Sequence, residues 1–359
     1  MTAEFDVLLV GAGHAHLGVL RRWAGGRRPR GRIALVSPEP YAWYSGMLPG
    51  LLAGRYALEQ CRIALRPLCA AAGIDWLGDS VTALEADTRT LSLAGGTACR
   101  ARWLSLNPGA EPPMPAREGG AMEVLPVKPF AGFVARWTEW RARPAPLAIL
   151  GGGAAGVELA LAMAAQVPAL TLCSAVRLLG AHPPALRSRA LGHLQAAGVR
   201  VLEHCAVERI RGDALEAGGR TVWRGGRLIL ASGARPLPWL VDSGLAVDAH
   251  GFVAIDGTLQ SVSHPQILAA GDCASLAATP HSGVYAVRQG PVLANNLAQA
   301  LAGRSLQTYH PQRHALALLA DGRGGALMSW AGLTAEGALL GRWKDFLDRR
   351  FMRLHSAGG

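Results

Sequence analysis

The stretch that most constrains the fold lies near the middle of the chain, where a short apolar run ends in a glycine-rich turn followed by an alanine-rich helix. The apolar run covers residues 147–150, and the turn carries Gly151, Gly153 and Gly156 in Gly-x-Gly-x-x-Gly spacing. The first glycine permits a tight turn, the second leaves room for a pyrophosphate, and the third lets the helix pack against the strand. Glycine-rich turns also simply close loops. Because strand, spacing and helix agree here, we predict a dinucleotide site at the helix N-terminus.

A second turn of this kind follows the first apolar run of the chain. The run covers residues 5–10, and the turn carries Gly11 and Gly13 but has His16 where a third glycine is expected. The histidine limits how closely the helix packs on the strand. We still predict a dinucleotide turn, because it follows a first strand and the pattern recurs downstream.

The second strand of each unit lacks the acidic residue that usually binds the adenosine ribose. After the strand expected at 32–36 stand Ser37 and Pro38, with Glu39 next. Either Ser37 or Glu39 binds the ribose, or Glu39 is a solvated loop carboxylate. After the strand at 169–172 stand Cys173 and Ser174, and Arg177 either meets a 2′-phosphate or lies on the surface.

Composition excludes several classes of protein. The 359 residues carry a net charge of +11, but no dense basic run with interleaved aromatic residues appears, so we expect no nucleic-acid binding. Six cysteines occur without a Cys-x-x-Cys pair, which argues against a metal site, a dithiol centre and a disulfide scaffold. We expect residues 1–10 to form a strand, not a signal peptide, and the protein to be cytoplasmic.

A third informative stretch is the apolar run 263–270, which ends in Gly271 and Asp272. An aspartate there can accept a ribityl hydroxyl of a flavin, or it can simply cap the strand exit. A helix opens near Tyr285, and its N-terminus would stabilise a reduced flavin.

Other segments have two interpretations each. The aromatic loop 41–50 is either a hydrophobic turn or a wall beside a flat cofactor. We expect a helix over 52–72, a linker over 108–115, and a helix over 130–143 with three aromatic residues on one side. The basic, aromatic helix over 343–352 either contacts a membrane surface or packs on its own domain.

The chain resembles the pyridine nucleotide–disulfide oxidoreductase flavoproteins over residues 3 to about 305. The resemblance rests on the order of four turns: the two glycine turns, the Ser232-Gly233-Ala234 turn and the Gly271-Asp272 turn. The resemblance implies an α/β protein with two Rossmann-like domains, the second inserted in the first, and a short C-terminal α+β tail. It implies an FAD-binding domain at 1–112 and 245–304, an NAD(P)H-binding domain at 113–244, and a C-terminal domain at 305–359.

Within this family, the chain resembles one subgroup that is similar to type II NADH dehydrogenases and to the oxidoreductase domain found fused to selenide, water dikinase. This narrower resemblance rests on the runs 13–16, 44–50, 283–294 and 343–345. That subgroup implies that Glu158 lies near nicotinamide and flavin, where it relays a proton or orients the ring, although a first-turn glutamate also suits the helix dipole. Gln289 matches a residue beside a quinone pocket. Lys128 is either a flavin contact or a surface ion.

The resemblance also implies a set of cofactor contacts. His14 and His16 would lie close to the flavin, or they pack in the core. The residues expected to bind FAD or NAD(P)H are Gly11, Gly13, His14, Ala15, His16, Ser37, Pro38, Ser45, Lys128, Gly151, Gly153, Gly156, Gly271, Asp272 and Gln289.

One departure from the family pattern decides the expected chemistry. Relatives that reduce disulfides keep a redox cysteine beside the flavin, but here Ser45 stands in the matching turn. A serine hydroxyl is far less acidic than a thiol and forms no mixed disulfide. We therefore expect an enzyme that passes electrons from NAD(P)H through FAD to a quinone-like or other small acceptor.

Two alternatives stay open. The first is a reductase of selenium or sulfur compounds that serves selenophosphate synthesis, with selenide, water dikinase as a partner. The second is a non-catalytic flavin-binding partner protein. We expect a monomer or a dimer, with peripheral contact to the inner face of a membrane as a further expectation.

Overall fold

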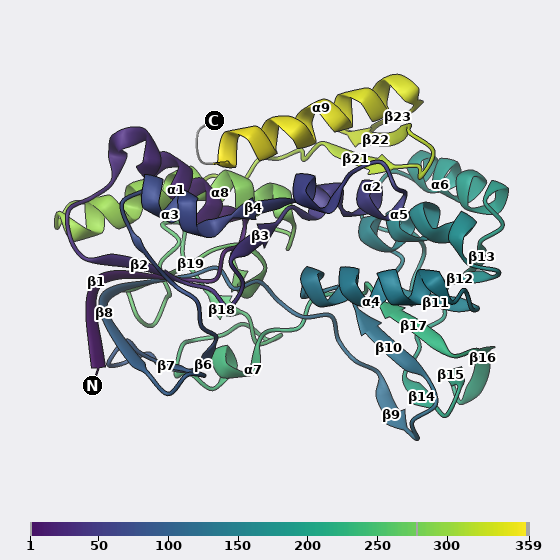
Figure 1. Cartoon of the computed structure of the whole chain (residues 1–359), viewed down its shortest axis with the longest axis horizontal. Helices are drawn as coiled ribbons and strands as arrows, with labels where there is room; N and C mark the ends of the chain where they lie inside the picture. Colours follow the sequence, from purple (N-terminus) through teal and green to yellow (C-terminus); the bar gives the residue numbers. More distant parts are fainter. Residues whose placement is uncertain (1, 278, 357–359) are drawn as a thin grey trace.

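The computed structural model describes residues 2–277 and 279–356 and contains two units built on parallel sheets. They lie side by side, and the last helix, α9 (Ala338–His355), lies across the top of both in Figure 1. The predicted α/β class with two Rossmann-like folds is confirmed.

The first unit is organised around β1, whose apolar residues are buried on both faces because helices cover the sheet. The parallel strands run in the order β5-β2-β1-β8-β19, and the antiparallel hairpin of β6 and β7 joins β8. These strands are β1 (Thr2–Val10), β2 (Ile33–Val36), β5 (Asp75–Leu77), β6 (Val81–Glu85), β7 (Thr90–Leu93), β8 (Ala98–Leu106) and β19 (Ile267–Ala269). The helices that cover them are α1 (His14–Arg22), α3 (Leu65–Ala71) and α8 (Gly283–Leu301).

The second unit repeats this plan around β11. Its five parallel strands run in the order β10-β17-β11-β12-β13. They are β10 (Glu123–Pro126), β11 (Leu147–Leu150), β12 (Leu170–Cys173), β13 (Arg200–Leu202) and β17 (Arg227–Leu230), with helices α4 (Phe130–Ala142), α5 (Ala154–Met163) and α6 (Pro184–Ala196). Below them in Figure 1, a smaller sheet contains β9 (Ala116–Glu118), β14 (Arg209–Arg211), β15 (Ala214–Ala217) and β16 (Arg220–Arg224). On α4 the predicted aromatic side is buried, since Phe133, Trp137 and Trp140 pack in the core.

The second unit is inserted in the first, because β19 returns to pair with β8 after β17 has completed the second sheet. The chain crosses between the units twice, and the two crossings form an antiparallel bridge between Glu111 and Arg235. Leu240, in the short helix α7 (Pro238–Val241), already packs in the core of the first unit. The domain limits at 112–113 and 244–245 stay predictions.

The C-terminal segment joins both units. A hairpin sheet of β21 (Ala317–Ala320), β22 (Ala326–Trp330) and β23 (Leu333–Gly337) precedes α9. Leu319 and Leu327 pack in the core of the second unit, whereas Met352 packs in that of the first. Among the described residues, no helix combines the length and apolar character needed to cross a bilayer.

The single helix expected over 52–72 is wrong. Helix α2 (Leu48–Leu52) ends before Gly54, whose φ of +74° lies in the left-handed region. A 3₁₀ turn (Leu58–Cys61) and the strand β4 (Arg62–Ala64) follow, and β4 pairs with β3 (Tyr41–Trp43). Pairing of β4 with the aromatic loop therefore overrides the helical periodicity. The remaining short elements are a π-turn (Trp23–Arg27), 3₁₀ turns at Ser45–Met47, Ala164–Gln166 and Gly271–Cys273, and the pair β18 (Val253–Ala254) and β20 (Ala274–Ser275).

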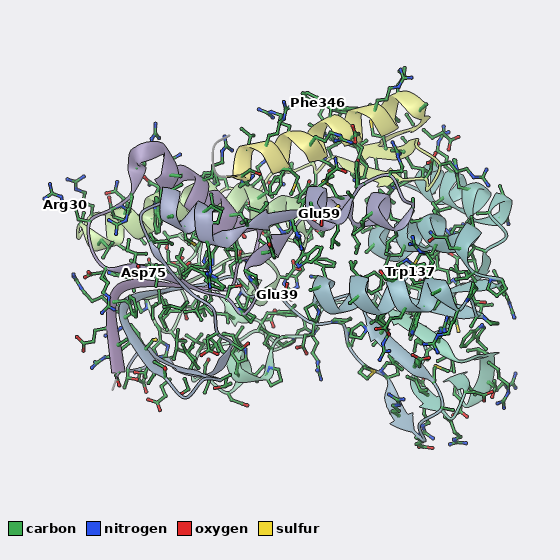
Figure 2. The ribbon with its side chains drawn as sticks, viewed as in Figure 1. Arg30, Glu39, Glu59, Asp75, Trp137 and Phe346 are labelled. Carbon is green, nitrogen blue, oxygen red and sulfur yellow. The ribbon has the colours of Figure 1, made fainter. Side chains whose placement is uncertain are left out.

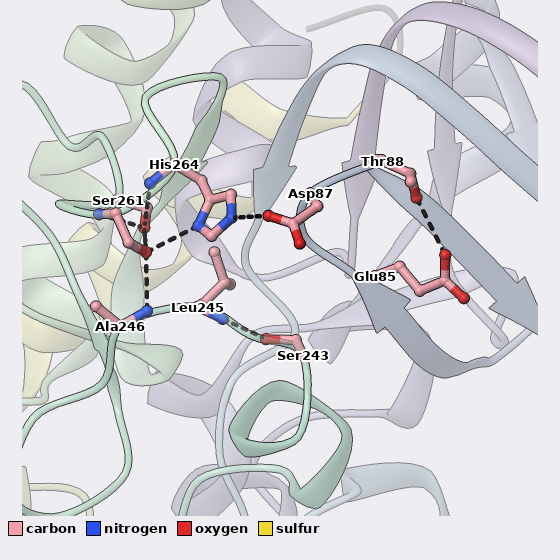
Figure 3. A network of polar contacts seen from close by, with 9 residues as sticks. Glu85, Asp87, Thr88, Ser243, Leu245, Ala246, Ser261 and His264 are labelled. Carbon is pink, nitrogen blue, oxygen red and sulfur yellow. Dashed lines mark hydrogen bonds and ion pairs between the residues drawn. The ribbon is translucent and has the colours of Figure 1, made fainter.

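A polar network ties the loop before β19 to the turn between β6 and β7 (Figure 3). His264 Nε2 lies 3.0 Å from Asp87 Oδ1, and its Nδ1 lies 2.8 Å from Ser263 Oγ. The Asp87 side chain is 97 % exposed, and Ser263 Oγ accepts the Ala246 N–H at 2.9 Å. The aspartate is in water and the serine is bonded to backbone, so this network connects two loops and is no hydrolytic triad.

Candidate functional site

The first glycine turn lies at the carboxyl end of β1 and is held by a residue that the sequence did not single out. Asn107, which follows β8, accepts the N–H groups of Ala15 and His16 on Oδ1 at 3.1 and 3.2 Å. Its Nδ2 donates to Ala270 O at 2.6 Å. A Cβ on Gly13 would lie 2.3 Å from Asn107 Oδ1, so this glycine is required by the close approach of Asn107. The Asn107 side chain therefore links the N-terminal turn of α1 to the residue that follows β19.

His16 is a hydrogen-bonded core residue that fixes the turn. It is fully buried, its Nδ1 lies 2.6 Å from Gly11 O, and its Nε2 lies 2.8 Å from Ser105 Oγ. Because a carbonyl only accepts, Nδ1 carries the proton and Nε2 accepts from the serine hydroxyl. Burial lowers the pKa of His16 to about 4, so the ring is neutral. The imidazole thus occupies the space that a third glycine would leave open.

Asp272, in the 3₁₀ turn that follows β19, has one oxygen in an ion pair and the other without a hydrogen-bond partner among the described residues. Lys128 Nζ lies 2.8 Å from Asp272 Oδ2, whereas the buried Oδ1 has no partner among the described atoms. Burial opposes ionisation, but the positive charge and the hydrogen bond of Lys128 outweigh it and lower the pKa of Asp272. An ionised oxygen without a donor indicates that a ligand hydroxyl or N–H belongs there.

Gln289 and Gly271 lie against this turn. Gln289, in α8, is 3 % exposed, and its Oε1 accepts the Gly271 N–H at 2.8 Å. Gln289 therefore orients the Gly271–Asp272 turn from within the core. Its predicted place beside an acceptor stays a prediction.

The second glycine turn has the geometry that its three glycines predict. Gly151 has a φ of +136°, and a Cβ there would lie 2.4 Å from Ala231 O. A Cβ on Gly156 would lie 1.7 Å from Gly151 O, so helix α5 requires glycine to approach the strand. No described atom lies within 4 Å of a Cβ built on Gly153, which is exposed. The chain itself does not need glycine at 153, and this open side fits the predicted pyrophosphate.

Ser37 and Pro38 lie near the first turn, because both follow β2, which pairs with β1. Ser37 is buried and its N–H donates to Leu77 O at 3.0 Å. Glu39 Oε2 accepts the Trp43 indole N–H at 2.8 Å. Glu39, labelled in Figure 2, is therefore bound to the aromatic loop and is not a freely solvated carboxylate.

Helix α9 is hydrogen-bonded to the loop that carries Ser45. We call the residues involved the α9 contact cluster: Tyr44, Gly46, Lys344 and Asp348. Lys344 Nζ donates to Gly46 O at 2.7 Å and to Asp348 Oδ2 at 2.8 Å, and Tyr44 Oη donates to Asp348 Oδ1 at 3.2 Å. The side chains of Lys344 and Asp348 are only 12 % and 7 % exposed. Burial raises the pKa of Asp348 although Lys344 opposes this, and burial with Asp348 nearby also raises the pKa of Tyr44.

Aromatic rings connect this cluster to the first glycine turn. Tyr44 stacks on Phe351 with ring centroids 4.2 Å apart, and Phe351 stacks on His355 at 4.0 Å. His14 lies 5.7 Å from the Tyr44 ring. Burial, with Lys128 and His355 nearby, lowers the pKa of His14 to about 4 although Asp272 opposes this, so His14 is neutral. The sequence predicted His14 as a cofactor contact, but it did not show that Phe351 of α9 lies beside this histidine.

Glu158, in the second turn of α5, faces the C-terminal segment. Its Oε1 accepts the Ala320 N–H at 2.7 Å. Burial raises its pKa to about 7 even though the positive charge of Lys344 and the Ala320 hydrogen bond favour the carboxylate. Glu158 can therefore hold or release a proton near neutral pH, and it lies within electrostatic reach of the α9 contact cluster.

A small cavity of about 20 Å³ adjoins this cluster. Gly46 and Gly50 form one side, and Tyr56, Lys344 and Asp348 form another. Tyr56 Oη donates to Asp345 Oδ1 at 2.7 Å, and both residues line the cavity. The cavity thus brings titratable groups from two separate segments, residues 55–56 and α9, beside the Ser45 turn.

A comparison with protein families gives one match over most of the chain. The family described as "Pyridine nucleotide-disulphide oxidoreductase" matches residues 5–290. Mercuric reductase from Acidithiobacillus ferrooxidans is 28 % identical over 165 residues, which cover 43 % of this chain and 30 % of the relative. A nitric oxide reductase FlRd-NAD(+) reductase from Salmonella paratyphi A is 34 % identical over 152 residues, which cover 38 % of this chain and 39 % of the relative. The chain spans between three and four tenths of the length of these curated relatives.

Solved structures match the whole fold at low sequence identity. The sulfide:quinone oxidoreductase of Aquifex aeolicus superimposes with a TM-score of 0.79 at 17 % identity, covering 100 % of this chain and 93 % of that one. The water-forming NADH oxidase of Lactobacillus brevis gives a TM-score of 0.76 at 20 % identity, covering 92 % and 75 %. These likenesses show the fold.

Proposed function

Because the chain belongs to the pyridine nucleotide-disulphide oxidoreductase family, we propose that it passes electrons from NAD(P)H through FAD to a small, quinone-like acceptor without a redox-active cysteine. Membership of the family confirms that the chain is an oxidoreductase and that FAD and NAD(P)H are its cofactors. The acceptor, the residue roles and the absence of a redox thiol are our proposal.

The residues around both glycine turns fit these cofactors. When bound, FAD supplies the two-electron chemistry that links hydride donors to acceptors. Asp272 Oδ1, which is buried and has no partner among the described residues, suits a ribityl hydroxyl, and Lys128 keeps this aspartate ionised. Gly11, Gly13, His14, Ala15, Ser37, Pro38, Ser45 and Gly271 would surround FAD, with His16 and Gln289 behind them as positioning residues. Gly151, Gly153 and Gly156 would hold the nicotinamide nucleotide.

The observation that carries the proposal is the chemistry of the turn next to Ser45. The α9 contact cluster surrounds this turn with hydroxyl, ammonium and carboxyl groups. Among the cysteines, Cys61 lies nearest along the chain; it is buried, and burial raises its pKa to about 12, so it carries no thiolate at neutral pH. A disulfide-type mechanism needs a thiolate, so direct transfer to an acceptor is the chemistry that this turn supports.

Glu158 supplies the acid–base function in this proposal. Reduction of a two-electron acceptor by NAD(P)H consumes one proton from solvent besides the hydride. A carboxyl group with a pKa of about 7 exchanges a proton efficiently near neutral pH. Glu158 therefore either transfers this proton or orients the nicotinamide ring.

The test is anaerobic reduction of the FAD-loaded protein. We expect NADH or NADPH to bleach the flavin absorbance and a soluble quinone analogue to restore it. If neither nucleotide bleaches the flavin, the proposal is wrong.

A second candidate acceptor is an oxidised selenium or sulfur compound, with selenide, water dikinase as the partner that uses the product. The resemblance of the runs 44–50 and 343–345 to the oxidoreductase domain found fused to selenide, water dikinase supports it. Reoxidation by selenite or polyselenide should be compared with reoxidation by the quinone analogue at equal concentration. Faster reoxidation by the quinone rejects this second candidate.

Peripheral contact with an anionic membrane is also part of the proposal. On the outer face of α9, Leu339, Trp343 and Phe346 are 76 %, 41 % and 55 % exposed, and Arg342 and Arg350 flank them. Figure 2 shows Phe346 on the side of α9 that points away from both units. Exposed apolar residues between arginines suit the surface of an anionic bilayer. Flotation with phosphatidylglycerol vesicles should recover the protein, and Phe346→Ala should weaken recovery. No binding to such vesicles contradicts this.

A further inference from the structure

Two cysteines lie in contact at the carboxyl end of the second sheet, away from the site described above. Cys173 is the last residue of β12 and is 2 % exposed, and Cys205 lies just after β13 and is partly exposed. Cys173 belongs to an apolar cluster of the second unit and Cys205 packs against that cluster, and each thiol is close enough to the other to shift its pKa. The other four cysteines, Cys61, Cys69, Cys99 and Cys273, are buried in the core of the first unit.

An irregularity of the backbone brings these two thiols together. Cys173 is aligned with Leu202, and the Ser174 N–H donates to Leu202 O at 2.8 Å. The next ladder bond runs from the Cys205 N–H to Ser174 O, also at 2.8 Å, so Glu203 and His204 bulge out of the strand. His204 has a φ of +54°, a conformation that non-glycine residues rarely adopt. A regular strand would not place residue 205 beside residue 173.

The same strand ends support the second glycine turn. A Cβ on Gly152 would lie 2.0 Å from Ser174 Oγ, so the residue after Cys173 contacts the turn itself. The Leu179 N–H donates to Gly152 O at 2.8 Å. On the other side, the Leu178 N–H donates to Glu203 Oε1 at 2.6 Å. A movement of residues 203–205 is therefore transmitted to the turn that would hold the nucleotide.

We propose that Cys173 and Cys205 form a reversible thiol pair that a hydroperoxide oxidises to a disulfide, and that this disulfide weakens nicotinamide nucleotide binding. Cys205, the more exposed thiol, attacks the O–O bond as thiolate and becomes a sulfenic acid, and one water leaves. The Cys173 sulfur then attacks the sulfenic sulfur, the S–S bond forms, and the second water leaves. Two thiols thus lose two electrons, and hydrogen peroxide is reduced to two waters.

The rate of this reaction should depend on pH. Burial raises the pKa of Cys173 to about 12 and also raises that of Cys205, with Arg200 as the cation that opposes the shift at Cys173. The thiolate fraction is therefore small at pH 7 and grows roughly tenfold for each pH unit. Disulfide formation should be about tenfold faster at pH 8 than at pH 7.

The experiment treats the FAD-loaded full chain with excess hydrogen peroxide and measures intact mass, linked peptides and KM for NADPH and NADH. We expect a loss of two hydrogen atoms (about 2 Da), a peptide that links residues 173 and 205, and at least a threefold higher KM, all reversed by dithiothreitol. Cys205→Ser and Cys205→Ala should show neither change, and the control Cys69→Ser should behave like the parent protein.

Two results would overturn the proposal. Oxidation of Cys205 to a sulfinic acid without a linked peptide rejects the pair. A linked peptide with an unchanged KM rejects the effect on the nucleotide. That effect rests on the proposed function, but the mass readout does not: if no nucleotide reduces the flavin even before oxidation, the proposed function fails while the linked peptide still decides the pair.

Discussion

Replacing Lys344 by methionine tests how α9 holds the loop of Ser45. The substitution keeps an unbranched side chain that is one atom shorter, but removes the ammonium that bonds Gly46 O and Asp348 Oδ2. The Asp348 side chain is only 7 % exposed, so its carboxylate would stay buried with Tyr44 as its remaining donor. Breaking a buried ion pair on one side costs roughly 3–5 kcal/mol. We expect Lys344→Met to lose about that much unfolding free energy.

The loss should depend on pH with a definite sign. Burial raises the pKa of Asp348 in the parent protein, and without the opposing charge of Lys344 this pKa rises further. The folded variant then keeps a proton that the unfolded chain releases above about pH 4. Stability of the variant should therefore fall as pH increases from the unfolded pKa towards the raised folded one. Lys344→Met/Asp348→Asn removes the buried charge, so it should recover most of the loss and show no such slope.

The assay is thermal and urea unfolding of the FAD-saturated proteins at pH 5 and pH 8. Arg342→Met, on the exposed side of the same helix, is the matched control and should change stability by less than about 0.5 kcal/mol. The reasoning fails if Lys344→Met is as stable as this control at pH 8. It also fails if the double variant is as unstable as the single one.

Three further predictions concern the glycine turns and Glu158. Gly156→Ala places a Cβ 1.7 Å from Gly151 O, so the protein should keep FAD but lose flavin reduction by NAD(P)H, measured by stopped flow; reduction at the parent rate contradicts the geometry. His16→Ala removes the partner of Ser105 Oγ and should cost about 1–3 kcal/mol together with slower FAD retention in dialysis; unchanged melting and retention would speak against a fixing role. Glu158→Gln should remove the titration near pH 7 from the pH profile of acceptor reduction, and a profile that keeps it shows that another group titrates there.

The sequence predicted those features that depend on neighbours along the chain. Gly156 is required by the contact between α5 and β11, because a Cβ there would meet Gly151 O, and this requirement is set within a few residues. The buried aromatic side of α4 follows from helical periodicity alone. In each case one local pattern allows one structure.

Features that depend on distant segments could not be predicted from a single sequence. Asn107 holds the first turn from 91 residues away, and Tyr44 meets Asp348 across 304 residues. His16 was expected near the flavin or in the core, and only the partners Gly11 O and Ser105 Oγ explain why histidine replaces glycine. The broken helix over 52–72 has the same origin, because the pairing of β4 with β3 is not visible in periodicity.

The central claim is that electrons pass through the flavin with no redox thiol beside it. The most direct measurement is an anaerobic titration of FAD-loaded Cys205→Ser protein, isolated in air, with dithionite, counting electrons per flavin. The variant removes any contribution from the Cys173–Cys205 pair. We predict complete reduction at two electrons per FAD, with no long-wavelength absorbance from a thiolate next to the ring. Uptake of four electrons per FAD would show a disulfide in communication with the flavin and would contradict the account.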